Sequence, residues 1–86
     1  MNEFLDYIQS LNPNYELEGI KKAYELAAEM HEGQLRKSGE PYLIHPVEVA
    51  KILAGLGMDE QTIIAGLLHD VVEDTEYTEE QLKQDF

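Results

Sequence analysis

Residues 60–74 read EQTIIAGLLHDVVED, and the spacing of their apolar side chains decides the fold class. Apolar residues recur here at steps of three and four, the repeat that places side chains on one face of an α-helix. They are Ile63, Ile64, Leu67, Leu68, Val71 and Val72. Just before them, Asp59 and Glu60 supply a cap and a negative charge for the helix start. The stretch therefore predicts a helix reaching to about Asp74, with a wide apolar face that must pack on neighbouring helices.

The rest of the chain is also predicted to be helical, because apolar residues keep this repeat and long alternating strand patterns are missing from the sequence. Three helices are expected earlier, at about residues 2–11, 15–32 and 46–56, the last with Pro46 at its first position. Another is expected to open at Thr78, where residues 78–81 match a capping box. The predicted fold class is all-α, a small bundle of about five helices.

The composition limits the classes of function. The chain has 86 residues, enough for one small domain, and no cysteine, which excludes disulfides and thiolate metal sites and fits the cytoplasm. Its net charge of -12 opposes general nucleic-acid binding and contact with anionic membranes. The acidic amino terminus is unlike a signal peptide, and no apolar run is long enough for a membrane span. A small anionic substrate would need concentrated cations or a metal ion.

Residues 69–74 read HDVVED and place metal-ligand side chains at helical spacing. The four-residue step stacks His69 over Glu73 and Asp70 over Asp74, so that all four side chains can border one cleft. An isolated His-Asp pair on an acidic chain is more typical of a solvated surface. Apolar neighbours on both sides, however, place this pair on a mostly buried helix, where charges need partners or a metal. The segment is therefore a candidate metal site.

The other two histidines are expected to differ in role. His45 lies near the start of the third expected helix, where the positive helix end disfavours a protonated imidazole and leaves a neutral metal ligand. Taken alone, it is better explained as a capping or core histidine; beside residues 69–74 it is the natural third ligand. His31 continues the apolar face of the second expected helix and is expected to be structural.

Arg36 and Lys37 are two of the six basic residues of the chain, and they are adjacent in a loop that contains Gly39. A guanidinium forks onto phosphate oxygens and stacks on flat rings, which suits recognition of phosphate or a nucleobase. A solvated loop explains the pair equally well. These two residues alone do not decide between the interpretations.

Two motifs together resemble the HD hydrolase domain of RelA/SpoT homologues. The first is QLRKSGEPYLIHP at residues 34–46, and the second is LLHDVVEDT at residues 67–75. Both occur in the family's order, and the resemblance extends over about residues 15–86, after a leading helix and turn at 1–14. It implies an HD-type helical fold and hydrolysis of the alarmone (p)ppGpp to GDP or GTP and pyrophosphate. The parent would be a GTP pyrophosphokinase/hydrolase of the stringent response.

The resemblance also implies a role for each candidate residue. One divalent ion, usually Mn²⁺ in the family, would be held by His45, His69 and Asp70. Glu73 and Asp74 match the acidic pair that orients and activates the attacking water. Arg36 and Lys37 match the loop that holds the guanine nucleotide. Residue types alone leave the metal open, because imidazoles and carboxylates without a thiolate suit Mn²⁺, Fe²⁺ or Zn²⁺.

The sequence departs from the family pattern at its carboxyl end. The family's fourth metal ligand is an aspartate on a later helix, beyond Phe86, so residues 1–86 are expected to be the amino-terminal part of the domain, which binds metal poorly and is inactive alone. The apolar face of residues 60–74 is expected to be unpaired within one molecule and to be covered by homo-oligomer formation. The competing function is a non-catalytic helical interaction module that inherited the HD residues. Whether the parent has synthetase and regulatory domains stays open.

Overall fold

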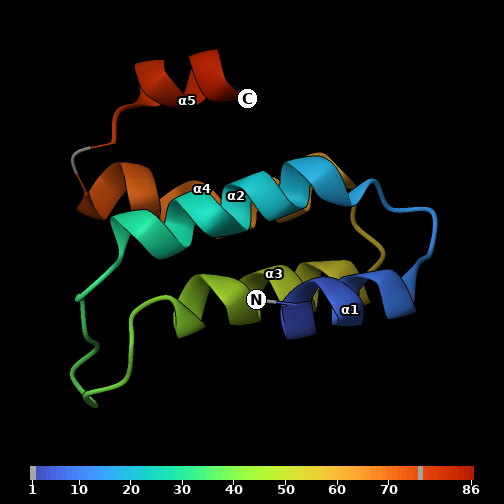
Figure 1. Ribbon diagram of the computed structural model, residues 1–86, viewed down its shortest axis with the longest axis horizontal. Helices are drawn as coiled ribbons and strands as arrows, with labels where there is room; N and C mark the ends of the chain where they lie inside the picture. Colours follow the sequence, from blue (N-terminus) through green and yellow to red (C-terminus); the bar gives the residue numbers. More distant parts are fainter. Residues whose placement is uncertain (1, 76) are drawn as a thin grey trace.

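The computed structural model describes residues 2–75 and 77–86, without the side chains of Asn2 and Asp74. These residues form five α-helices: α1 (Asn2–Leu11), α2 (Leu17–Met30), α3 (Ile44–Gly55), α4 (Glu60–Asp74) and α5 (Glu79–Asp85) (Figure 1). In the described part of the chain the only β pairing is an isolated bridge between Leu35 and Pro41. The predicted all-α class is confirmed.

Helix α4 is the centre of the bundle. It packs against α2 on one side and α3 on the other, while α1 lies against α3 and α2 (Figure 1). Gly66 allows the approach of α3, because a Cβ atom at this position would lie 2.7 Å from Cδ1 of Leu53. The interior is filled by fully buried side chains of several helices: Ile8, Ile20, Pro46, Ile63, Leu67, Leu68 and Val71. This core holds the ends of α3 and α4 that carry the candidate ligands.

The apolar face of α4 is mostly covered inside one molecule. Of its six predicted residues four are buried, namely Ile63, Leu67, Leu68 and Val71. Ile64 and Val72 at its edge remain half-buried. The expectation of an unpaired face is therefore wrong for the four buried positions, because α2 and α3 already cover them. Homo-oligomer formation stays a prediction. The apolar surface of α4 that could drive it is smaller than expected.

The helix ends follow the predicted chemistry in part. The Asp59 side chain accepts a hydrogen bond from the Thr62 N–H at 2.8 Å, and Thr78 and Gln81 form both bonds of the predicted capping box. Helix α2 is shorter than predicted, at Leu17–Met30. The reason at its start is that the backbone of Glu16 is extended, which makes Glu16 the N-cap and Leu17 the first helical residue.

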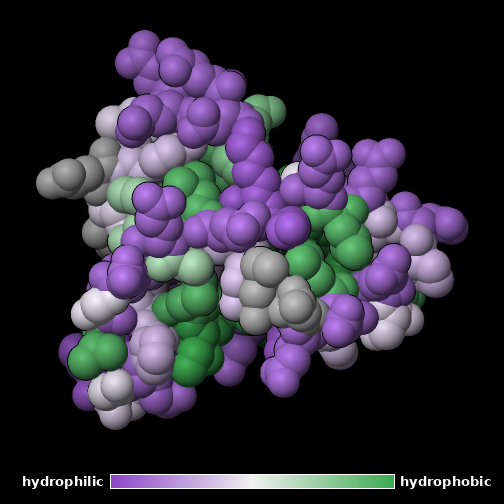
Figure 2. Space-filling model, viewed as in Figure 1, coloured by the Kyte–Doolittle hydropathy of each residue, from purple (hydrophilic) through white to green (hydrophobic). Residues whose placement is uncertain are grey.

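The surface reflects the acidic composition. Figure 2, drawn in the same view as Figure 1, shows mostly hydrophilic side chains on the face toward the viewer, with apolar patches between them. None of the described helices combines the length and apolar character that crossing a bilayer requires. Helix α5 stands apart from the other helices at one end of the molecule (Figure 1).

Candidate metal centre

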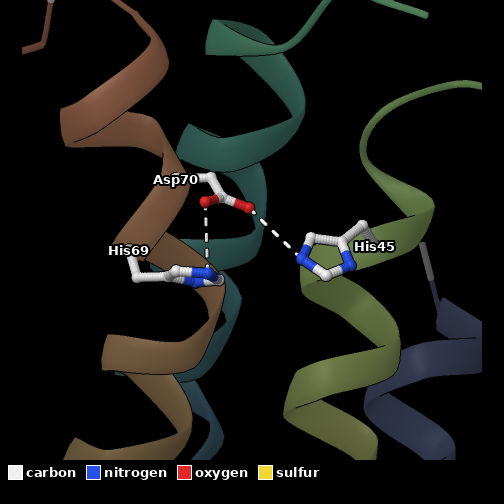
Figure 3. Close-up of side chains that lie close together, drawn as sticks. All are labelled: His45, His69 and Asp70. Atoms are coloured by element: carbon white, nitrogen blue, oxygen red, sulfur yellow. Dashed lines mark ion pairs between the residues drawn. The ribbon is translucent and has the colours of Figure 1, made fainter. Parts of the chain in front are cut away.

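Three predicted ligands meet where α3 and α4 lie side by side. His45 is in the first turn of α3, and His69 and Asp70 are adjacent in α4. One nitrogen or oxygen atom of each side chain lies within 4.8 Å of the others (Figure 3). Residues 24 positions apart in the sequence, 45 and 69, are thus brought to a single point. This distance suits one metal ion shared by the three side chains.

Asp70 is the centre of the cluster. Its Oδ1 lies 3.1 Å from Nε2 of His69, and its Oδ2 lies 3.4 Å from Nε2 of His45. The Asp70 side chain is 10% exposed, while the histidines are 40% and 46% exposed. A buried carboxylate therefore faces two imidazoles that open to solvent. Such a carboxylate needs a positive partner, because burial of an unpaired charge is costly.

The tautomer of His69 follows from its second hydrogen bond. Its Nδ1 lies 2.9 Å from the carbonyl oxygen of Gly66, one helical turn earlier. A carbonyl only accepts, so Nδ1 carries the proton, and in a neutral ring the lone pair is then on Nε2. That lone pair faces Oδ1 of Asp70, another acceptor. A metal ion bound by both atoms would offset the repulsion between these two acceptors.

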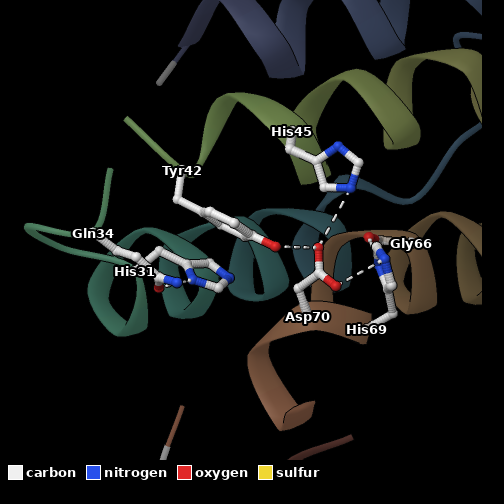
Figure 4. A network of polar contacts seen from close by, with 7 residues as sticks. All are labelled: His31, Gln34, Tyr42, His45, Gly66, His69 and Asp70. Carbon is white, nitrogen blue, oxygen red and sulfur yellow. Dashed lines mark hydrogen bonds and ion pairs between the residues drawn. The ribbon is translucent and has the colours of Figure 1, made fainter. Parts of the chain in front are cut away.

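A tyrosine and a histidine behind the carboxylate were missed as parts of the site by sequence reasoning. The Tyr42 hydroxyl donates to Oδ2 of Asp70 at 3.1 Å, and the Tyr42 ring lies against His31, with ring centres 4.8 Å apart (Figure 4). His31 is 3% exposed, as its predicted place in the core requires, and its Nδ1 lies 2.9 Å from Oε1 of Gln34. The sequence feature that could have pointed to Tyr42 is its position three residues before His45, a candidate ligand.

Comparison with known proteins gives the family. The sequence model of the HD domain matches residues 23–86, most of the chain. The chain belongs to the HD domain family. A family with this name and a cluster of two histidines and an aspartate point to binding of a divalent metal.

The relatives of this HD domain are named as enzymes that act on guanine nucleotides. A GTP pyrophosphokinase of Myxococcus xanthus is 56% identical over 92% of this chain and 10% of its own length. A guanosine-3′,5′-bis(diphosphate) 3′-pyrophosphohydrolase of Aquifex aeolicus is 52% identical over 100% of the chain and 12% of its own length. An enzyme with the same name from Haemophilus influenzae is 61% identical over 71% of this chain and 9% of its own length. The chain thus spans about a tenth of these curated relatives, and its resemblance to RelA/SpoT homologues is confirmed.

The acidic pair predicted to act on water is described in part. Glu73 lies on α4 one turn after His69, and its side chain is exposed. The side chain of Asp74 lies outside the described residues. Glu73 and His69 both line a groove between α4 and α5, so they face the same space. The structure thus brings one member of the pair beside the cluster.

The predicted nucleotide loop of this HD domain is exposed. Arg36 and Lys37 lie in a hairpin-like turn, in which the Arg36 N–H donates to the Glu40 carbonyl at 2.8 Å. The described polar contacts include none between either cationic side chain and the ligand cluster. The two cations are free to meet a ligand, and the structure does not itself bring them to the metal centre.

A groove of about 730 Å³ lies between α4 and α5. Its walls are mainly apolar side chains, among them Ile64, Leu68, Val72, Leu82 and Phe86. His69 is the one member of the ligand cluster that reaches this groove. The groove therefore adjoins the metal centre but differs from it in chemistry.

Proposed function

We propose that this HD domain hydrolyses (p)ppGpp to pyrophosphate and GDP or GTP, as part of a RelA/SpoT-type enzyme of the stringent response. Residues 1–86 would form the amino-terminal part of its hydrolase domain, with 1–14 as a leading segment and 15–86 as the HD region. The observation that supports the proposal most is the pair of contacts made by His69. Its Nδ1 is hydrogen bonded to the Gly66 carbonyl, and its Nε2 lies 3.1 Å from the Asp70 carboxylate. The names of the relatives supply the substrate.

The proposed metal ligands are His45, His69 and Asp70. Two imidazoles and one buried carboxylate fit a divalent ion of the first transition series, and the family resemblance favours Mn²⁺ among them. When bound, such an ion lowers the pKa of a coordinated water and offsets the charge of a phosphate. The Gly66 carbonyl, 2.9 Å from Nδ1, would keep His69 in the tautomer whose Nε2 is free to hold the ion.

The remaining candidate residues are proposed to act on water and on the nucleotide. Glu73, exposed beside His69, would take a proton from the attacking water, with Asp74 helping to orient that water. The water oxygen bonds to phosphorus, the bond from phosphorus to the ribose 3′ oxygen breaks, and the 3′ oxygen takes up a proton. Arg36 and Lys37 would bind phosphate and base, roles that matter in a chain with a net charge of -12.

The proposal is tested by removing the metal ligands. In the parent enzyme, His69→Ala or Asp70→Ala is expected to abolish pyrophosphate release from ppGpp, because each removes a ligand from a small set. Glu48→Gln, at an exposed carboxylate on α3, serves as the matched control and should leave the rate unchanged. Unchanged hydrolysis in either ligand variant would contradict the assignment. The 86-residue chain alone is expected to be inactive.

The alternative function is a non-catalytic helical interaction module, and the apolar groove between α4 and α5 is the observation that favours it. The two functions differ in their dependence on metal. An interaction module would retain its partner after Asp70→Ala, whereas the hydrolase would lose activity. The predicted cytoplasmic location stays a prediction under both functions.

A further inference from the structure

We propose that Tyr42 is a positioning residue of the metal centre, which holds the Asp70 carboxylate in the orientation that the metal needs. The inference rests on the proposed function, because it assigns a role toward the same ion. Its basis is the hydrogen bond of 3.1 Å from the Tyr42 hydroxyl to Oδ2 of Asp70. This bond ties the segment before α3 to the middle of α4.

The carboxylate needs such a contact because of its freedom of rotation. The torsion that turns an aspartate carboxylate is broad and has nearly equivalent states. In this site the two oxygens are not equivalent, since Oδ1 faces His69 and Oδ2 faces His45. A donor fixed at Oδ2 keeps Oδ1 directed at Nε2 of His69. Hydrogen bonds of this kind, from outside the ligand set, commonly change metal affinity by about 10-fold to 100-fold.

Tyr42 is itself held in place from two sides. Its ring lies 4.8 Å from the buried ring of His31, at an interplanar angle of 39°, and its edge faces His45 at 6.1 Å. Its backbone N–H donates to the Gln34 carbonyl at 2.9 Å, and the Gln34 side chain contacts His31. The tyrosine is thus fixed before any ion binds. Its hydroxyl has little freedom to leave Asp70.

The same contacts connect the metal centre to the loop that carries Arg36 and Lys37. Leu35 and Pro41 pair across the base of this loop, and Tyr42 follows directly. His31 and Gln34 come from its other side. The base of the loop is therefore anchored next to Asp70, while its cationic tip stays exposed.

The test is Tyr42→Phe, which removes the hydroxyl and keeps the ring on His31. Free Mn²⁺ is counted by electron paramagnetic resonance in a titration of the parent enzyme, and circular dichroism checks that each variant is folded. The dissociation constant for Mn²⁺ is expected to rise about tenfold. Tyr15→Phe is the matched control, because it removes another tyrosine hydroxyl bonded at the opposite end of α3, to the Met58 carbonyl, and should leave the affinity unchanged.

Three results separate the outcomes. Mn²⁺ affinity of the Tyr42→Phe parent enzyme within twofold of the unsubstituted parent, with binding lost in Asp70→Ala, would overturn the role of Tyr42 and leave the metal centre intact. The carboxyl ¹³C resonance of Asp70 in the metal-free 86-residue chain should shift in Tyr42→Phe, and an unchanged resonance would also overturn the inference. Equal Mn²⁺ retention by the parent enzyme and its Asp70→Ala variant would overturn the proposed metal centre together with the inference.

Discussion

Helix α4 buries four apolar side chains completely or nearly so, whereas the next helix, α5, has no buried residue in the described structure. The two helices are neighbours in the chain, yet they are stabilised differently. Helix α4 is enclosed by α2 and α3. Helix α5 depends on its capping box, on half-buried Leu82, and on contacts at its end, where Lys22 donates to the Asp85 carbonyl at 2.6 Å.

This difference explains where the candidate ligands lie. His69 and Asp70 are on the helix whose position is set by the core, and His45 is on a helix packed directly against it. A metal site needs ligand positions held within a fraction of an ångström, which buried packing provides. Helix α5 contributes to the apolar groove but supplies none of the three ligands.

The largest effect on stability should come from the core of α4. Leu67 is fully buried, so Leu67→Ala is expected to lower the free energy of unfolding by about 2–5 kcal/mol, a large part of the stability of a small domain. Leu82→Ala in α5, where the side chain is half-buried, is the matched variant and should cost less. Urea unfolding of both variants measures the difference. Equal losses would break the distinction between the two helices.

A pH-dependent effect is expected at the connection to α5. Burial raises the pKa of Tyr77 to about 12, assisted by its hydrogen bond to the Asp85 carboxylate and the charge of that group. The folded chain therefore keeps this proton to higher pH than the unfolded chain, where the pKa is about 10. The resulting stabilisation is complete below pH about 10 and is lost as pH rises toward about 12.

The check is thermal unfolding between pH 9 and 12 for the original chain and Tyr77→Phe. The informative quantity is the difference between the two proteins, because they differ only in the Tyr77 hydroxyl. The original chain should lose more stability with rising pH than the variant. Parallel losses would mean that Tyr77 does not carry the effect.

The smallest effect on stability is expected at the N-caps of α4 and α5. The two helices can be compared by replacing each N-cap residue with alanine. Thr78→Ala removes the cap of α5 and should cost about 1 kcal/mol, confined to α5. Asp59→Ala removes the bond to the Thr62 N–H at the start of α4 and should lower the stability of the whole bundle. Amide hydrogen exchange separates local from global opening. Faster exchange throughout α4 in Thr78→Ala would show that the helices are coupled.

The sequence by itself determined the helices and their caps. Apolar repeats and the acceptors at Asp59 and Thr78 act within a few residues, so the pattern of α4 and the start of α5 could be predicted. The two motifs also predicted the HD family, which is confirmed. They identified the candidate ligands as well, whose roles stay a prediction. These properties depend on local spacing or on whole motifs.

Only the tertiary structure decided which distant residues meet. The pairing of His45 with His69 and Asp70, the bond from Tyr42, and the cover of α4 by α2 and α3 all depend on how helices cross. Helical periodicity says which face is apolar but not which neighbour covers it, so the expectation of an unpaired α4 face was largely wrong. Likewise, a tyrosine in a loop shows nothing of the carboxylate 28 residues away until packing brings the two together.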